Sequence, residues 1–135
     1  MNNMNSFDDT VSAVLTEYRN ALSQSDADAI ASLYTPDGVL MPQNSPSSAG
    51  INAIRAAYAG MLEAIGLETS FKIAEARQVA PEWGFARTNS IGTITIRATG
   101  GGVPEANQEL ILFQKVGEAW KIARYCFSTT LPPQA

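Results

Sequence analysis

The sequence predicts an α+β fold in which three N-terminal helices pack on the concave face of a curved antiparallel sheet. The first observation is that apolar residues recur at helical spacing up to about residue 65, whereas later residues alternate as in strands. The second is the order of elements, because three helices with one short strand inserted precede four long strands. We expect a single domain over residues 7–130, with flexible tails at 1–6 and 131–135.

Two helices and a short strand are expected at the amino end of the chain. Residues 7–23 carry apolar side chains every three or four positions, and Ser6 is placed to cap the start of this helix. A second, shorter helix is expected over residues 25–34, because residues 36–38 read Pro-Asp-Gly and favour a turn. The apolar residues 39–41 then form a short strand, and the following proline ends it because proline has no amide proton for sheet pairing.

A third helix and four long strands complete the expected fold. Helical spacing returns over residues 51–65, after a loop rich in proline, serine and asparagine, and Gly66 is placed to end this helix. The last two strands form a hairpin about Gly117-Glu118, a two-residue turn with glycine first. The four strands are expected at residues 67–80, 85–98, 107–116 and 119–130.

The hairpin turn determines which side chains share a face of the sheet. If pairing continues from the turn without a shift, Glu109, Phe113 and Arg124 lie on the same face. The same alternation in the neighbouring strands adds Phe71 and Asn89 to this face. Because this face carries the larger side chains, we expect it to lie beneath the helices.

The opposite face of the sheet has no helix left to cover it, although much of it is apolar. Its apolar residues are expected to be Ile94, Ile96, Leu110, Leu112, Tyr125 and Phe127. A large exposed apolar surface usually marks an interface, and a two-fold partner copy is the simplest cover. The sequence therefore predicts a homodimer formed through the outer sheet face.

Composition excludes several classes of partner and cofactor. The chain has no histidine and one cysteine, Cys126, so we expect no metal site, no internal disulfide and no histidine-activated nucleophile, with Cys126 filling core space. The net charge of −4 argues against nucleic acid or anionic lipid as a partner. No apolar run approaches membrane-spanning length and residues 1–5 lack a secretory-signal pattern, so we expect a cytoplasmic protein that needs no cofactor.

The layout resembles the nuclear transport factor 2-like superfamily, which includes ketosteroid isomerases, SnoaL-like polyketide cyclases and the calcium/calmodulin-dependent kinase association domain. The stretches that carry the resemblance are residues 18–22, 26–34, 50–55 and 119–125. The resemblance implies a cone-shaped pocket between the concave sheet face and the helices, and often a dimer. It leaves the activity open, because this fold hosts enzymes, binders and assembly modules.

One catalytic feature of the isomerases is missing from the sequence. The resemblance implies a general-base aspartate in the strand that leads into the loop, close to a proline, but this chain reads Leu-Met-Pro-Gln at residues 40–43. No aspartate follows Asp37 in the chain. We therefore expect the protein to lack ketosteroid isomerase activity.

Tyr18 and Glu109 are the candidate catalytic residues. The resemblance implies an oxyanion-hole tyrosine at the position of Tyr18, and it places the accompanying protonated acid near Glu109. Each residue also has a purely structural interpretation. Tyr18 can be a core aromatic at helical spacing, and Glu109 can form a buried ion pair with Arg124, diagonal to it across the hairpin.

The sequence also suggests which residues contact a ligand. These are Met41, Gln43, Asn44, Tyr58, Phe71, Asn89, Phe113 and Arg124. The apolar members are expected to line the pocket wall, the amides Gln43 and Asn44 to offer neutral hydrogen bonds at the rim, and the remaining polar residues to form the floor.

Two classes of function follow from these observations. The leading hypothesis is a domain that binds a small, mostly apolar molecule in the pocket, with cofactor-independent isomerase or polyketide cyclase-like catalysis as an extension. The alternative is a non-catalytic ligand-binding or association domain, which the missing aspartate and histidine favour. Hydration or epoxide opening would require more converging carboxylates than the sequence offers.

Overall fold

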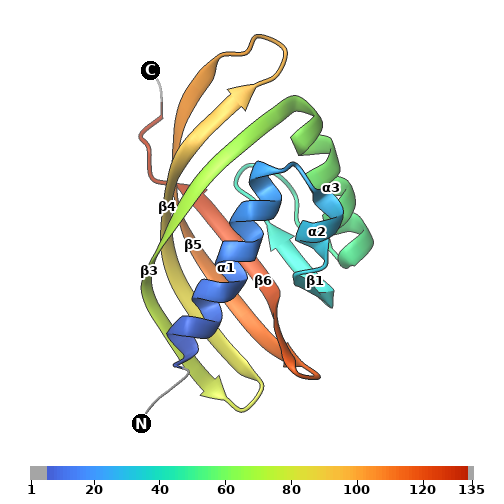
Figure 1. Cartoon of the computed structure of the whole chain (residues 1–135), viewed down its shortest axis with the longest axis vertical. Coiled ribbons are helices and arrows are strands. Elements are labelled where there is room, and N and C mark those ends of the chain that lie inside the picture. The colour runs from blue at the N-terminus through green and yellow to red at the C-terminus, as the bar shows by residue number, and fades with distance from the viewer. Residues whose placement is uncertain (1–5, 134–135) are drawn as a thin grey trace.

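Six strands form one curved sheet that does not close on itself, and the helices lie against its concave face (Figure 1). The computed structural model describes residues 6–133. The helices are α1 (Phe7–Ser23), α2 (Ala27–Ala31) and α3 (Ile51–Ala64). The strands are β1 (Tyr34–Met41), β2 (Ser48–Ala49), β3 (Ile65–Ala80), β4 (Trp83–Ile96), β5 (Gly102–Val116) and β6 (Ala119–Thr129). The predicted α+β class is confirmed, with strand order β2-β1-β6-β5-β4-β3.

Helix α1 crosses the concave face of the sheet and buries the apolar stripe predicted for it. Ser6 caps the helix, its hydroxyl oxygen accepting a hydrogen bond from the amide of Asp9 at 3.3 Å. A Cβ atom at Gly84 in β4 would lie 2.3 Å from the ring of Phe7, so the missing side chain lets the start of α1 rest on the sheet. The buried stripe consists of Val11, Val14, Leu15, Tyr18, Ala21 and Leu22.

Strand β1 begins earlier than expected, because Tyr34 belongs to it rather than to the preceding helix. The amide of Ile122 in β6 donates to the carbonyl of Leu33 at 2.8 Å, so the chain is bound to the sheet directly after α2. Strands β1 and β6 are parallel, so the sheet is not wholly antiparallel. Strand β1 ends at Met41, directly before Pro42, as predicted.

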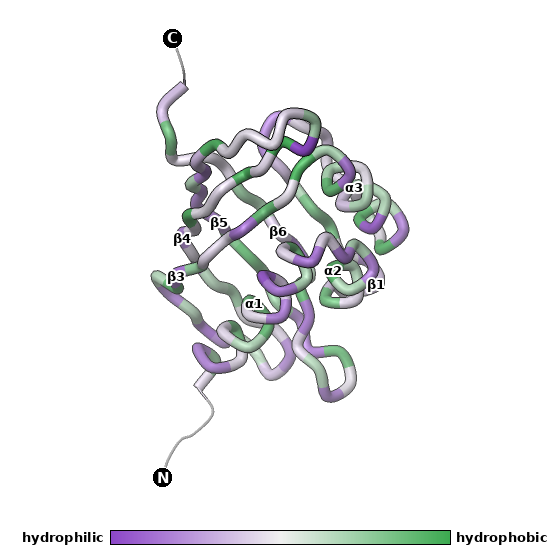
Figure 2. Tube along the Cα trace, turned by 45° about the horizontal axis from the view of Figure 1, so that its top comes forward, coloured by the Kyte–Doolittle hydropathy of each residue, from purple (hydrophilic) through white to green (hydrophobic). Residues whose placement is uncertain are grey.

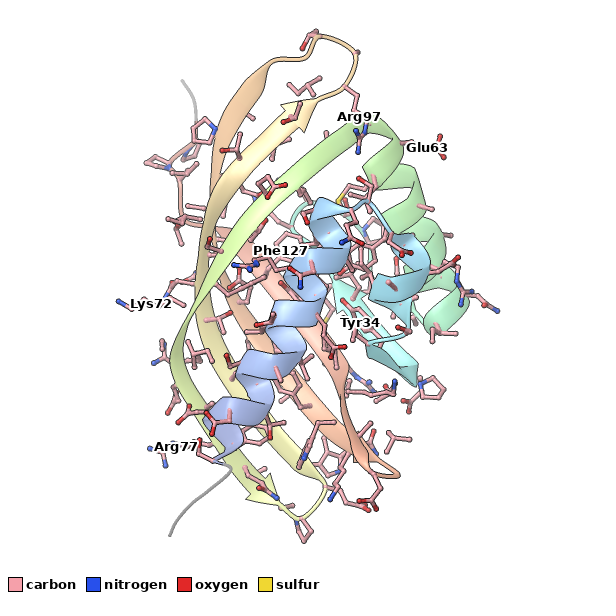
Figure 3. The ribbon with its side chains drawn as sticks, viewed as in Figure 1. Tyr34, Glu63, Lys72, Arg77, Arg97 and Phe127 are labelled. Carbon is pink, nitrogen blue, oxygen red and sulfur yellow. The ribbon has the colours of Figure 1, made fainter. Side chains whose placement is uncertain are left out.

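Helix α3 continues directly into β3, and the expected glycine end of this helix is wrong. Gly66 is a strand residue opposite Thr95. The carbonyls at the end of α3 are bound instead by Arg97, whose Nε donates to Leu62 at 2.9 Å and whose backbone amide donates to Ala64 at 3.0 Å. Figure 3 places Arg97 at this junction of helix and sheet.

The hairpin of β5 and β6 contains a bulge that corrects the predicted faces. Pairing follows the predicted register as far as Phe113 opposite Ile122, and then shifts by one residue so that Leu112 faces Arg124. Each such shift turns the following side chains to the other face. Tyr125 is therefore buried against the core, and Arg124 does not share the inner face with Glu109 as predicted.

The same bulge moves Cys126 out of the core. Its side chain is exposed on the outer face, next to Met41 of β1 and Leu110 of β5 in the strand pairing. Phe127 is instead half-buried on the helical side of the sheet, where it packs against the core.

Bulges in β3 also change the face of Asn89. The pairing places Phe71 opposite Ser90 and Lys72 opposite Asn89, with one shift directly before Glu75 and another near the turn. Asn89 is exposed and shares the outer face with Lys72, which projects away from the helices in Figure 3. The expected position of Asn89 on the concave face is therefore wrong.

The outer face is apolar in its centre, as predicted, but its residues differ from those expected. Leu110 is 49% exposed and Leu112 37% exposed, whereas Tyr125 is 4% exposed and lies inside. Hydrophobic and hydrophilic residues alternate along the strands (Figure 2). Among residues 6–133, no helix is long and apolar enough to cross a membrane. Of the expected tails, residues 131–133 form no helix or strand, and Ser6 caps α1. Residues 1–5 and 134–135 lie outside the described residues.

Candidate functional site

A cavity of about 300 Å³ lies between the concave sheet face and the helices. Residues of α1, α3 and strands β3 to β6 form its walls, and the loop after β1 forms part of its rim through Pro42, Ser45 and Pro46. Most of the wall is apolar. The apolar lining residues are Leu22, Leu40, Ala57, Met61, Ile65, Leu67, Phe71 and Phe127.

Strand β5 supplies a row of polar side chains to this otherwise apolar cavity. Glu105, Asn107 and Glu109 all line it, because alternate residues of a strand point to the same side. The side-chain amide of Asn107 donates to Oε1 of Glu105 at 3.0 Å. Ser90 of the neighbouring strand β4 also reaches the cavity.

Glu109 is the most deeply buried carboxyl group at the site. Its side chain belongs to a residue only 6% exposed, and it accepts hydrogen bonds from Thr88 at 2.5 Å and Ser90 at 2.6 Å. None of the ion pairs formed within residues 6–133 includes it. The structure therefore replaces the predicted ion pair with two neutral hydroxyl donors.

Burial raises the pKa of the Glu109 carboxyl above its usual range, and the negative charge of Glu105 adds to the increase. The hydroxyls of Ser90 and Thr88 oppose this rise, because they stabilise the ionised form. A carboxyl group with a raised pKa can hold its proton closer to neutral pH and donate it to an acceptor in the cavity.

Three tyrosines form a chain of hydroxyl groups beside the cavity. The hydroxyl of Tyr58 lies 2.6 Å from that of Tyr18 and 2.8 Å from that of Tyr34. Tyr18 and Tyr58 line the cavity, whereas Tyr34 lies behind them. Burial raises the pKa of all three hydroxyls well above the ordinary value, so they stay protonated and serve as hydrogen-bond donors.

The direction of hydrogen bonding along this chain affects what a ligand meets. If Tyr34 donates to Tyr58 and Tyr58 donates to Tyr18, the proton of Tyr18 is free to point into the cavity. The ring centroids of Tyr125 and Tyr18 lie 5.5 Å apart, and the charge of Glu109 adds to the rise in the pKa of both hydroxyls. Tyr18, Tyr125 and Glu109 therefore all line the cavity and influence one another electrostatically.

Four of the ten predicted site residues line the cavity, namely Tyr18, Tyr58, Phe71 and Glu109. Phe113 instead lies fully buried in the core, where its ring contacts Phe7. Asn89 and Arg124 face outward because of the strand shifts, and Arg124 donates to the carbonyl of Asp37 at 3.2 Å.

The predicted residues near the end of β1 do not line the cavity either. Met41 is 42% exposed on the outer side, and its neighbour Leu40 points inward in its place. Gln43 accepts a hydrogen bond from the amide of Thr129, which ties the loop to β6. Asn44 is exposed at a left-handed backbone position with a φ of 60°.

Sequence reasoning missed several residues of the site. These are Thr88, Ser90, Glu105, Asn107, Tyr125 and Phe127. The alternation Glu-x-Asn-x-Glu over residues 105–109 was a usable signal, because three polar residues on one strand face stand out beside the apolar residues that follow. Tyr125 and Phe127 could not be assigned without knowledge of the bulge.

The described part of the chain contains no group of three or more histidine, cysteine, aspartate or glutamate residues arranged to hold a metal ion. The polar groups of the cavity are carboxyl, amide and hydroxyl groups. Chemistry by these residues alone is therefore limited to hydrogen bonding, polarisation and proton transfer.

Comparison with known families identifies the one to which the chain belongs. The family model described as the SnoaL-like domain matches residues 15–125. The chain belongs to the SnoaL-like domain family. A search of curated proteins found no match.

Several solved structures are similar to this SnoaL-like domain. A ketosteroid isomerase-like protein from Erwinia carotovora atroseptica is 34% identical, with a TM-score of 0.86 and coverage of 96% of this chain and 100% of that chain. A protein from Novosphingobium aromaticivorans, provisionally named a scytalone dehydratase, is 16% identical, with a TM-score of 0.83 and coverage of 90% and 83%. A provisionally named calcium/calmodulin-dependent protein kinase II association domain from Xanthomonas campestris is 20% identical, with a TM-score of 0.80 and coverage of 93% and 89%. The last two establish similarity of fold alone.

Proposed function

We propose that this SnoaL-like domain binds a small, mostly apolar compound that carries a carbonyl or hydroxyl oxygen, and that it does so without a cofactor. The observation that carries the proposal is Glu109, a buried carboxyl group with a raised pKa that faces an apolar cavity and forms no ion pair within the described chain. The names of enzyme neighbours with the same fold agree with a ligand pocket.

We place the oxygen of the ligand between Tyr18 and Glu109, which both line the cavity. Both groups can donate a hydrogen bond there, Tyr18 when Tyr58 donates to it and Glu109 in its protonated form. The cavity volume of about 300 Å³ is at the small end for ligand pockets, which favours a compact ring system. Two donors on one carbonyl oxygen also stabilise an enolate, so the site suits isomerase or cyclase-like chemistry.

The direct test measures, by calorimetry, the binding of 2-naphthol, a compact apolar molecule with one hydroxyl group. Removal of either donor, in Tyr18→Phe or Glu109→Leu, is expected to weaken binding by roughly tenfold, as for the loss of about one good hydrogen bond. The matched control is Glu118→Leu, because Glu118 is exposed in the β5–β6 turn. Failure of 2-naphthol to bind, or equal binding by all variants, would contradict the proposal.

We also propose that the domain forms a homodimer through the centre of its outer sheet face. The exposed apolar side chains there are Met41, Leu110 and Leu112, with the half-buried Phe85 beside them in the strand pairing. An apolar area in the middle of a sheet is unfavourable in water, and a second copy related by a two-fold axis can cover it with the same apolar area. A neighbour of the same fold is provisionally named an association domain, and assembly without ligand binding is therefore the second candidate function.

A further inference from the structure

The cavity wall contains acidic side chains but no basic side chain to balance them. Glu105 and Glu109 both line the cavity, and none of the described residues that line it is a lysine, arginine or histidine. None of the ion pairs formed within residues 6–133 includes either glutamate. The charge of Glu105 contributes to the raised pKa of Glu109, because the two groups repel each other when both are ionised. A positive charge in the cavity would relieve this repulsion.

Glu105 has room beside it for a group of the ligand. It is half-buried, and its Oε1 accepts a hydrogen bond from the side-chain amide of Asn107 at 3.0 Å, which leaves further lone pairs for a second donor. Its partner on β4 is Gly92, which has no side chain to cover the carboxylate. Among the described residues, the pairing of β6 with β5 ends at Asn107 opposite Thr129, so no residue of β6 lies opposite Glu105.

Arg19 of α1 does not neutralise Glu105. Both residues line an open hollow outside the cavity, but no ion pair joins them within residues 6–133. Arg19 is exposed to water and lines this hollow rather than the cavity itself. The negative charge of Glu105 is therefore available to a ligand in the cavity.

Aromatic rings add to the attraction of this cavity for a positive charge. The faces of such rings attract cations, and the attraction is stronger where water is excluded. A metal ion would need more oxygen ligands than the described residues bring together, whereas an organic cation also fits the apolar wall. The aromatic lining residues are Tyr18, Tyr58, Phe71, Tyr125 and Phe127.

The spacing of the two glutamates indicates the length of the ligand. Residues 105 and 109 are four positions apart on one face of β5, which corresponds to roughly 13 Å between their Cα atoms. A ligand that lies between the carboxyl groups, with a hydrogen bond of about 3 Å at each end, spans roughly 7 Å between its own polar atoms. One aromatic ring with a hydroxyl group and a short aminoalkyl chain at opposite positions has about this length.

We propose that the ligand of this cavity carries a protonated amine at the end opposite its oxygen, and that Glu105 binds this amine. The proposal rests on the proposed function, in which Tyr18 and Glu109 hold the oxygen. The amine donates hydrogen bonds to the carboxylate of Glu105, and Asn107 holds that carboxylate in place. The ligand class is therefore a compact cyclic amine with a hydroxyl or carbonyl group, and repulsion from Glu105 disfavours ligands that carry a carboxylate.

The test compares three phenols of similar size by calorimetry at neutral pH. Tyramine carries an ammonium group, 4-ethylphenol is its neutral counterpart, and 4-hydroxyphenylacetate carries a carboxylate. The wild type is expected to bind tyramine roughly tenfold more tightly than 4-ethylphenol, as for one hydrogen bond between charged groups. It should bind 4-hydroxyphenylacetate more weakly than 4-ethylphenol, because like charges repel.

Two variants show whether this preference belongs to Glu105. Glu105→Gln should bind tyramine and 4-ethylphenol about equally, and its unchanged affinity for 4-ethylphenol shows that the cavity is intact. Glu118→Gln is the matched control, because it removes the same charge from the exposed β5–β6 turn and should keep the wild-type preference. This control separates a contact with Glu105 from the general attraction of an acidic protein for cations.

The amine proposal and the proposed function fail in different ways. Equal binding of tyramine and 4-ethylphenol by the wild type would overturn the amine proposal and leave the binding of the oxygen intact. A preference for tyramine that survives in Glu105→Gln, or that Glu118→Gln abolishes equally, would also overturn it. If the wild type bound neither 2-naphthol nor any of the three phenols, both proposals would be overturned.

Discussion

Ser90 and Glu109 face the cavity from neighbouring strands and share a hydrogen bond of 2.6 Å. Thr88 binds the other carboxylate oxygen, so β4 holds Glu109 with two hydroxyl groups and no positive charge. Hydroxyl groups can donate to a carboxylate or accept from a carboxylic acid. This arrangement fixes the orientation of Glu109 in either protonation state, which a salt bridge would not allow.

The first prediction concerns the pH dependence of stability. Because burial raises the pKa of Glu109 in the folded state, the folded chain binds this proton more tightly than the unfolded chain does. The resulting stabilisation is complete below the unfolded pKa and is lost as the pH rises through the folded pKa. Thermal unfolding from acid to neutral pH should therefore show the wild type losing stability relative to Glu109→Gln as the pH rises. A difference between the two that is constant with pH would refute the raised pKa.

The second prediction concerns the hydroxyl groups that hold Glu109. Thr88→Val and Ser90→Ala each remove one donor to the buried carboxylate, and we expect each to cost roughly 1–3 kcal/mol of unfolding free energy at neutral pH. In Glu109→Gln the same substitutions should cost less, because an amide has no charge to stabilise. Denaturant titrations of the single and double variants measure this coupling. Equal costs in both backgrounds would mean that the hydroxyl groups act independently of Glu109.

The third prediction tests the dimer. Leu112→Asp places a charge in the centre of the outer sheet face and should convert a dimer to a monomer in light scattering after gel filtration. Leu131→Asp is the matched control, because Leu131 is similarly exposed, at 42% against 37%, but lies beyond the last strand. A wild type that is already monomeric at micromolar concentration would contradict the homodimer, and so would a Leu112→Asp variant that remains dimeric.

The elements with a strong local signal could be predicted from the sequence. Helix α1 has the predicted bounds, because a serine cap, an acidic first turn and a regular apolar stripe all indicate the same segment. The turn at Gly117-Glu118 was also correct, since its pairing holds from Val116 to Phe113. The residues within these two elements are therefore sufficient to predict the bounds of the helix and the position of the turn.

The inner and outer faces of the sheet could not be predicted beyond the first bulge. A shift of one residue at Ala123 exchanges the faces of Arg124 and Tyr125, and local sequence carries no clear sign of it. The bulge places the large ring of Tyr125 against Tyr18, a contact between residues far apart in the chain. Tyr18, Tyr58 and Glu109 were found without that information, because their own elements were correctly placed.

The last prediction concerns the loop after β1. Pro42 lies at the cavity rim, and no carboxyl group lines that side of the cavity. The wild type should therefore show little isomerisation of a β,γ-unsaturated ketosteroid. Pro42→Asp adds a carboxylate at the rim and is expected to increase turnover, with a positioned base contributing on the order of a hundredfold or more. The control is Pro42→Asn, because asparagine has the same shape as aspartate but cannot take a proton at neutral pH. The rate is followed by the ultraviolet absorbance of the conjugated product. Wild-type turnover equal to that of Pro42→Asp would mean that a base is already placed for this substrate, and equal gains from aspartate and asparagine would mean that the loop acts through shape rather than proton transfer.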